Sequence, residues 1–173
     1  MCQKAAPAAP ATLVATGIAM CAAFATAGAG DASAARGADP RVAAMLAAAQ
    51  LGHTVDADGD FRILYALQDG RTQLAWIASE TAIVAGLELR ELWSVALQGR
   101  GEPAPALLAR LLEDNAARRV GAWQLQRSGD EYLVVLSAPV PAAADAATLL
   151  PQLEAVAVGA DAMERALDGR DGF

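Results

Sequence analysis

Two short turn sequences, each set between runs of alternating apolar and polar residues, constrain this fold more than any other feature. One is Asp69-Gly70 and the other is Ser128-Gly129-Asp130. The flanking runs are residues 61–67, 72–79, 120–127 and 131–138. An Asp-Gly pair suits a type I′ turn, whose central residues need positive φ, and such a turn joins antiparallel neighbours. The sequence therefore predicts a sheet built from hairpins rather than from helical crossovers.

Helical spacing of apolar residues marks three further segments. Asp39 can cap a first helix that Pro40 opens and Gly52 ends. A leucine-rich helix runs from Leu107 to about Arg118, and a closing amphipathic helix covers 149–167, where Pro151 is tolerable only in the first turn or as a kink.

One more strand is predicted at residues 87–97, where apolar residues alternate on one face that only Glu91 interrupts: Leu87, Leu89, Trp93, Val95 and Leu97. The segments around it, 80–86 and 99–103, are predicted to be connections. The expected order is helix, three strands, helix, two strands, helix. This order indicates an α+β fold with an antiparallel sheet.

The first 36 residues have a composition unlike that of a folded domain. Lys4 gives a weakly positive end, residues 13–24 form a short apolar run, and small residues follow it. This order is typical of a secretory signal peptide, with cleavage expected between residues 25 and 29. The alternatives are an alanine-rich disordered leader or a true start at Met20 or Met45. We therefore divide the chain into a signal peptide (1–29), a flexible leader (30–37) and one folded domain (38–173).

Charge and rare residues narrow the classes of function. The chain of 173 residues has net charge -7, which disfavours sequence-independent contact with nucleic acid or with an anionic membrane. The only histidine is His53, and both cysteines, Cys2 and Cys21, lie in the predicted signal peptide. We expect no catalytic residues, no metal and no cofactor, because thiol, triad and most metal chemistries lack their residues.

Two clusters of charged residues have a structural and a functional interpretation. Asp56, Asp58 and Asp60 resemble the start of a calcium loop, but positions six and twelve are Phe61 and Leu67, so we expect a turn in which Gly59 supplies positive φ. The basic residues of the second cluster are Arg110, Arg118 and Arg119. Acidic residues lie between them, which favours a solvated helix face over a ligand site.

The order of several short motifs resembles the YbjN-like family over residues 38–173. These motifs are the helix before Asp56-Ala57-Asp58-Gly59-Asp60-Phe61, the turn Gly70-Arg71-Thr72-Gln73, the helix 107–115 before Gly121-Ala122-Trp123, and the ending Ala160-Asp161-Ala162-Met163-Glu164. The resemblance implies a bacterial sensory transduction regulator whose fold is similar to that of type III secretion chaperones, which often form dimers. The family has no agreed catalytic residues to transfer. Its familiar members are cytoplasmic. This chain differs from them in its predicted signal peptide.

The leading functional hypothesis is therefore a non-catalytic module, periplasmic or secreted, that binds a protein or peptide through its sheet face or an exposed edge strand. After signal cleavage we expect no membrane contact. The alternatives are a cytoplasmic regulator with a mis-annotated start, and a hydrolase. A homodimer is expected by analogy, through a surface containing Trp93, Leu107 or Leu111. The three tryptophans are expected in the core by default, with a peptide groove as the alternative for one of them.

Overall fold

The computed structural model describes residues 37–169 and 171–173. The predicted signal peptide, 1–29, and all but the last residue of the predicted leader, 30–37, lie outside the described residues. The elements are α1 (Pro40–Ala48), β1 (Thr54–Val55), β2 (Phe61–Ala66), β3 (Thr72–Val84), β4 (Leu87–Arg100), α2 (Pro105–Ala117), β5 (Ala122–Ser128), β6 (Glu131–Pro141) and α3 (Ala146–Leu167). A one-turn 3-10 helix (Gln68–Gly70) lies between β2 and β3.

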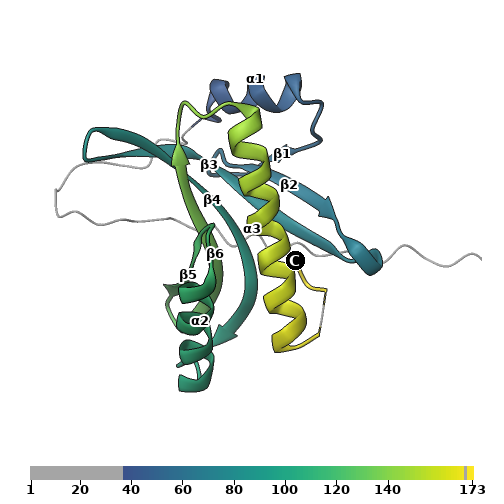
Figure 1. Cartoon of the computed structure of the whole chain (residues 1–173), viewed down its shortest axis with the longest axis vertical. Helices are drawn as coiled ribbons and strands as arrows, with labels where there is room; N and C mark the ends of the chain where they lie inside the picture. Colours follow the sequence, from purple (N-terminus) through teal and green to yellow (C-terminus); the bar gives the residue numbers. More distant parts are fainter. Residues whose placement is uncertain (1–36, 170) are drawn as a thin grey trace, which may run out of the picture.

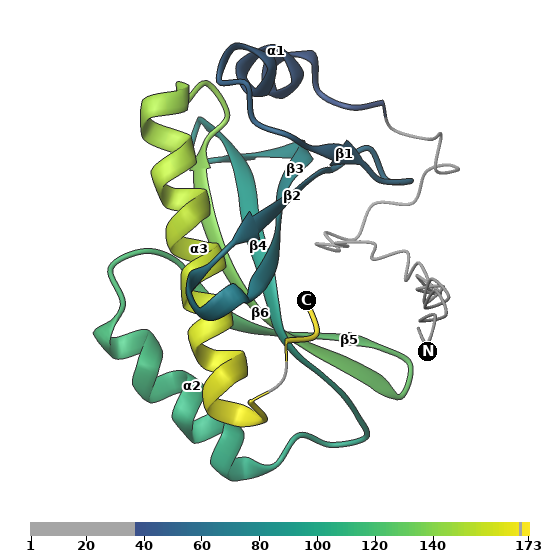
Figure 2. The same cartoon turned by 90° about the vertical axis from the view of Figure 1, so that its right-hand side faces the viewer.

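The strands form one antiparallel sheet in the order β1-β2-β3-β4-β6-β5. The α+β class with an antiparallel sheet is thus as predicted. α3 runs along one face of this sheet, and α1 and α2 lie near its two ends (Figures 1 and 2).

The first hairpin confirms the predicted turn. Asp69 has φ 61° and ψ 22°, and Gly70 has φ 73°. The amide of Arg71 donates to the carbonyl oxygen of Gln68 at 3.3 Å. Positive φ at both central residues is the requirement of a type I′ turn.

The structure corrects the predicted element boundaries in three places. The short strand β1 adds a fourth strand before α2, because Thr54 and Val55 pair with the start of β2. Residues 80–86 are not a loop: β3 and β4 pair almost to their tip, which leaves a turn at Ala85-Gly86. Likewise β4 continues to Arg100 and pairs with β6 from Leu89 onward, so the predicted connection begins two residues later than expected. A register shift between Val95 and Leu97 interrupts the predicted alternation, and Leu97 packs against the second core cluster.

The closing helix also begins earlier than expected. Asp145 is its N-cap, and its side chain accepts a hydrogen bond from the amide of Thr148 at 2.9 Å. α3 therefore starts at Ala146, and Pro151 lies in its second turn rather than its first. The cap sets this start because it satisfies amides that have no partner within the helix.

The core consists of two apolar clusters along α3. The first lies between α1, strands β2 to β4, the end of β6 and the N-terminal half of α3, and the second between α2, strands β4 to β6 and the C-terminal half. α3 thus joins the two halves of the molecule, and its long buried side provides a continuous wall for both clusters.

Candidate protein-interaction surface

All three described helices pack on the same face of the sheet. Leu92 of β4 is buried in the first cluster beside Leu153 of α3. Its partner on β6, Ala138, is buried in the second cluster, which includes Leu111 of α2. Directly paired residues point to the same side of a sheet. We call this side the covered face and the other side the open face.

The open face has a central row of residues that pair across the strands: Arg62, Trp76, Trp93, Ser137 and Ala122. A line of residues along β4 crosses it: Leu87, Leu89, Glu91, Trp93 and Val95. We define the open face by this row and this line. Since successive residues of a strand point to opposite faces, the apolar alternation of β4 points away from the helices. The face of β4 beneath the helices instead presents Arg90, Leu92 and Ser94.

Two tryptophans lie at the centre of the open face. The rings of Trp76 and Trp93 stack with centroids 4.1 Å apart and planes 4° from parallel. The guanidinium carbon of Arg62 lies 5.7 Å from the centroid of the Trp76 ring, within the range of a cation–π contact. The two rings are only half-buried. Of the three tryptophans, Trp123 alone is buried in the core as expected.

A fixed carboxylate lies beside the tryptophan pair. The Oε1 atom of Glu91 accepts a hydrogen bond from the hydroxyl of Ser137. It also accepts one from the side-chain amide of Gln124 at 3.4 Å. The open face therefore presents one cation, Arg62, and one anion, Glu91, on the two sides of the stacked rings.

Several aliphatic residues of the open face are exposed to solvent. Leu64 on β2 is 61% exposed, and Leu87 at the start of β4 is 64% exposed. Val84 pairs with Leu87 at the tip of the β3–β4 hairpin, and that hairpin extends away from the rest of the sheet (Figure 1). These exposed residues form an apolar surface of the kind that is typical of a protein-interaction site, whereas Val95 and Ser137 of the same face are buried, at 4% and 1%.

The structure separates the three residues predicted for the interaction surface. Trp93 lies on the open face, whereas Leu107 and Leu111 belong to the second core cluster on the covered face. Leu111 is only 5% exposed, so it belongs to the core and is not presented to a partner. The neighbouring Leu112 is the exposed leucine of α2, at 69%.

A buried ion pair on the covered face was missed by sequence reasoning. Arg90 has a fully buried side chain that donates to the carboxylate of Asp39, the N-cap of α1, and to the carbonyl oxygens of Ala78 and Ser79. This pair ties α1 to the sheet. The alternation of β4 carried the signal, because it places Arg90 on the same side as Leu92.

The carboxylates around this pair titrate at low pH. Hydrogen bonds from Arg41 and Arg90 hold the pKa of Asp39 well below its usual range. The same Arg41 guanidinium, followed by the Thr81 hydroxyl, lowers the pKa of Glu88 to about 2. Both acids therefore stay charged at neutral pH, and α1 is attached to the sheet by ionised groups.

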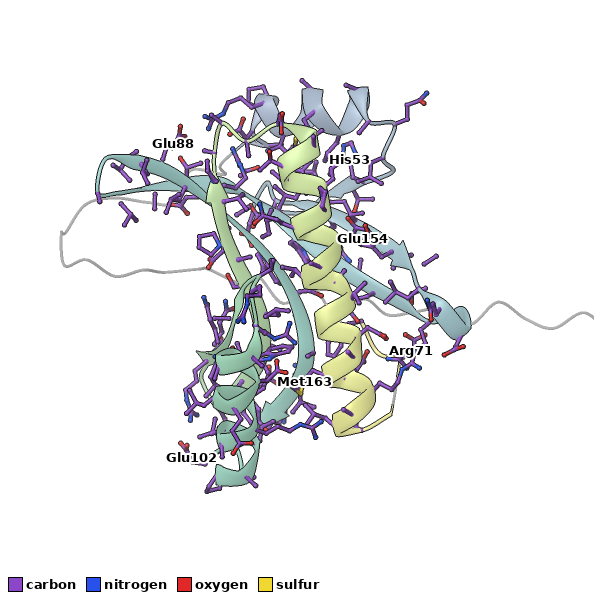
Figure 3. All side chains as sticks on the ribbon, viewed as in Figure 1. His53, Arg71, Glu88, Glu102, Glu154 and Met163 are labelled. Atoms are coloured by element: carbon purple, nitrogen blue, oxygen red, sulfur yellow. The ribbon has the colours of Figure 1, made fainter. Side chains whose placement is uncertain are left out.

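A second charged cluster lies where the C-terminal end of α3 meets the start of β3. Carboxylate oxygens of Asp161, Glu164 and Asp171 lie within 4.8 Å of one another, a spacing that can suit a metal ion. Arg71, in the turn just before β3, reaches this cluster, as Figure 3 shows, and its guanidinium pairs with Asp161 and, at 2.9 Å, with Glu164. The arginine therefore supplies the positive charge among these acids. Burial raises the pKa of Glu164.

The aspartate-rich segment after β1 is the predicted turn. The Oδ1 atom of Asp56 accepts hydrogen bonds from the amides of Asp58 and Asp60, at 3.1 and 3.0 Å. Gly59 has φ 88°, as expected. Nearby, His53 is exposed, with Nδ1 3.0 Å from the carbonyl oxygen of Leu51. The carboxylate of Asp56 thus binds local backbone amides, and that of Asp60 accepts from the amide of Ser79 on β3 at 2.8 Å.

The expected solvated face of basic residues is wrong for Arg118. Its guanidinium pairs with Asp114 and lies 4.8 Å from the centroid of the Trp123 ring. It also packs on Gly159 of α3, where a Cβ atom would come within 2.7 Å of it. Arg118 therefore fastens the end of α2 to α3. A cavity of about 290 Å³ beside it is lined by Arg110, Glu113, Asp114, Arg118, Ala162 and Met163.

Comparison with known proteins identifies no relative of this chain. No family model, no curated protein and no solved structure matches the chain. The resemblance to the YbjN-like family therefore stays a prediction. Within the described residues, none of the helices has the length and apolar character needed to cross a bilayer.

Proposed function

We propose that this chain is a non-catalytic, YbjN-like protein-binding module, exported from the cytoplasm, with a regulatory or chaperone-like role. The observation that carries the proposal is the apolar alternation of β4 on the open face. A strand that only completes a core directs its apolar residues toward that core. In β4 the stacked Trp93 and the exposed Leu87 point away from it instead.

The composition of the open face supports binding over catalysis. Tryptophan and arginine are among the residue types that contribute most to binding at protein interfaces, and the open face presents Trp76, Trp93 and Arg62. The carboxylate of Glu91 is held by Ser137 and Gln124. The exposed His53, by contrast, lies beyond α1 beside Leu51 and has the covered-face residue Phe61 as its ring neighbour, with centroids 5.5 Å apart.

Photo-crosslinking tests the proposed surface. A photoreactive amino acid at Leu64, on the open face, is expected to form adducts with protein in living cells. The same amino acid at Leu112, which is at least as exposed but lies on α2, is expected to form few. Protein adducts at Leu112 and none at Leu64, in a chain that keeps its circular dichroism spectrum, would contradict the proposal.

Export is tested by fractionation combined with intact-mass measurement. We expect a mature chain in the periplasm or the medium that begins between residues 25 and 29. An uncleaved chain in the cytosol would instead support the alternative of a cytoplasmic regulator.

A further inference from the structure

We propose that the open face binds a second copy of this chain, packed sheet to sheet about a twofold axis that runs along β3. This inference rests on the proposed function, because it names the partner of the same surface. Three properties of the open face lead to it: the kind of partner that an apolar sheet face accepts, its charge, and the order of its strands.

An apolar sheet face favours a folded partner over an extended peptide. A peptide laid across Trp76 and Trp93 would lose the water bound to its backbone amides and carbonyls, and these side chains offer them few replacements. A second sheet satisfies its own backbone by strand pairing and presents only side chains. Two such faces pack about 10 Å apart in the sandwich arrangement of many all-β proteins.

The charge of the open face permits contact between identical acidic molecules. The whole chain has net charge -7. The central row and the β4 line of the open face nevertheless contain one cation, Arg62, and one anion, Glu91. The face is therefore neutral, and two copies meeting there avoid the repulsion that their other surfaces produce.

The strand order makes this face complementary to itself. β3 lies between β2 and β4, so a twofold axis along β3 places β2 of each copy over β4 of the other. Arg62 on β2 then lies opposite the part of β4 that presents Glu91 and Trp93. The arrangement creates the same pair of opposite charges twice, with Trp76 of the two copies near the axis, as an isologous interface requires.

The exposed residues of the open face are also accounted for. Leu64 follows Arg62 on the same side of β2, and Leu87 lies on the same line of β4 as Glu91. Both would lose solvent contact in the sandwich. Ile83, which is 69% exposed at the same hairpin tip, pairs with Glu88 and points to the other side. It would stay exposed.

Sedimentation of the full chain provides the first test, with a matched pair of variants. The wild type is expected to sediment as a concentration-dependent dimer. Leu87→Lys should raise the dimer dissociation constant by about tenfold or more, because it places an ammonium group in an apolar contact. Ile83→Lys, at the same tip but on the opposite side, should leave the constant within about twofold. Equal effects of the two variants would overturn the proposal.

Exchange of the two charges tests the geometry. Arg62→Glu and Glu91→Arg each bring like charges together and should each weaken the dimer by about tenfold. The double variant restores opposite charges and should recover most of the wild-type affinity. The twofold arrangement would be overturned if the double variant loses as much dimer affinity as the two single variants together. Thermal unfolding must show that the double variant is folded.

Tryptophan fluorescence tests the same interface without any substitution. Dilution of the wild type across the dissociation range should shift the emission to longer wavelength, because Trp76 and Trp93 become hydrated. The shift should persist in Trp123→Phe. A wild type that stays monomeric at millimolar concentration would overturn this inference. If crosslinks at Leu64 then join the chain to a different protein, the proposed function stands without the dimer, whereas the absence of any protein adduct rejects both.

Discussion

On the covered face of the sheet, helices enclose Arg90, Gln73 and Ser94 among aliphatic residues, whereas on the open face two tryptophans and several leucines keep part of their surface in solvent. Most buried polar atoms of these side chains have fixed partners, although Oε1 of Gln73 and Nε of Arg90 have none among the described residues. Gln73 donates to Ser94 Oγ and to the carbonyl oxygen of Val95, at 2.8 and 2.7 Å. The difference teaches that polarity alone does not identify the core side of a strand, because a polar side chain with internal partners can be buried at little cost.

The largest expected effect lies on the covered face, at Arg90. Arg90→Ala leaves the carboxylate of Asp39 without its buried partner, and we expect it to lower the free energy of unfolding by about 3–5 kcal/mol. Arg41 pairs with the same carboxylate from the surface, and Arg41→Ala should cost less than about 1 kcal/mol. Urea denaturation of both variants measures this contrast. Equal losses would show that burial does not distinguish the two arginines.

A second contrast compares adjacent leucines of α2. Leu111→Asp places a carboxylate in the second core cluster, and we expect a loss of about 3 kcal/mol or more. Leu112→Asp changes an exposed position and should stay within about 0.5 kcal/mol of the wild type. Thermal unfolding followed by circular dichroism gives both values. A folded Leu111→Asp chain that loses only its self-association would return the interaction surface to α2.

On the open face, Trp93→Leu should have a smaller effect on folding. It removes the stack with Trp76 but keeps an apolar side chain, and we expect a loss of about 1 kcal/mol. Its effect on self-association should be larger than its effect on stability. Urea denaturation and sedimentation of one preparation distinguish the two. A loss of several kcal/mol would show that Trp93 belongs to the core.

The smallest expected effect is on the loss of stability at acidic pH. Because Arg41 and Arg90 lower the pKa of Asp39 in the folded chain, this carboxylate contributes stability above its unfolded pKa of about 4. That contribution is lost progressively as the pH falls through the folded pKa. Between pH 6 and about 3, Asp39→Asn should therefore lose less stability than the wild type. Denaturation at a series of pH values measures the two slopes, and parallel slopes would contradict this assignment.

Features that depend on neighbouring residues were predictable from the sequence. The positive φ values of Asp69 and Gly70, the cap by Asp39 and the hydrogen bonds within the turn after Asp56 all follow from contacts a few residues apart. Such contacts depend on local chemistry that the sequence displays directly.

Features that depend on distant residues were not predictable. Whether odd or even residues of β4 face the core depends on where α3 packs. Arg90 is acceptable in that core only because Asp39, 51 residues earlier, supplies a carboxylate. The position of the open face follows from the same packing. The sequence therefore predicted Trp93 as a candidate residue of the interaction surface. It did not predict the side of the sheet on which Trp93 lies.

The strand order also has a consequence for the order of folding. β4 pairs with β3 through a tight turn, but its other edge receives β6, which the chain reaches only after α2 and β5. Local hairpins close in microseconds, whereas this pairing must wait for a long loop to close. On a ribosome, the outer edge of β4 therefore stays unpaired until β6, residues 131–141, is synthesised. During that interval it is an open strand edge, and the nascent chain is most prone to aggregation there.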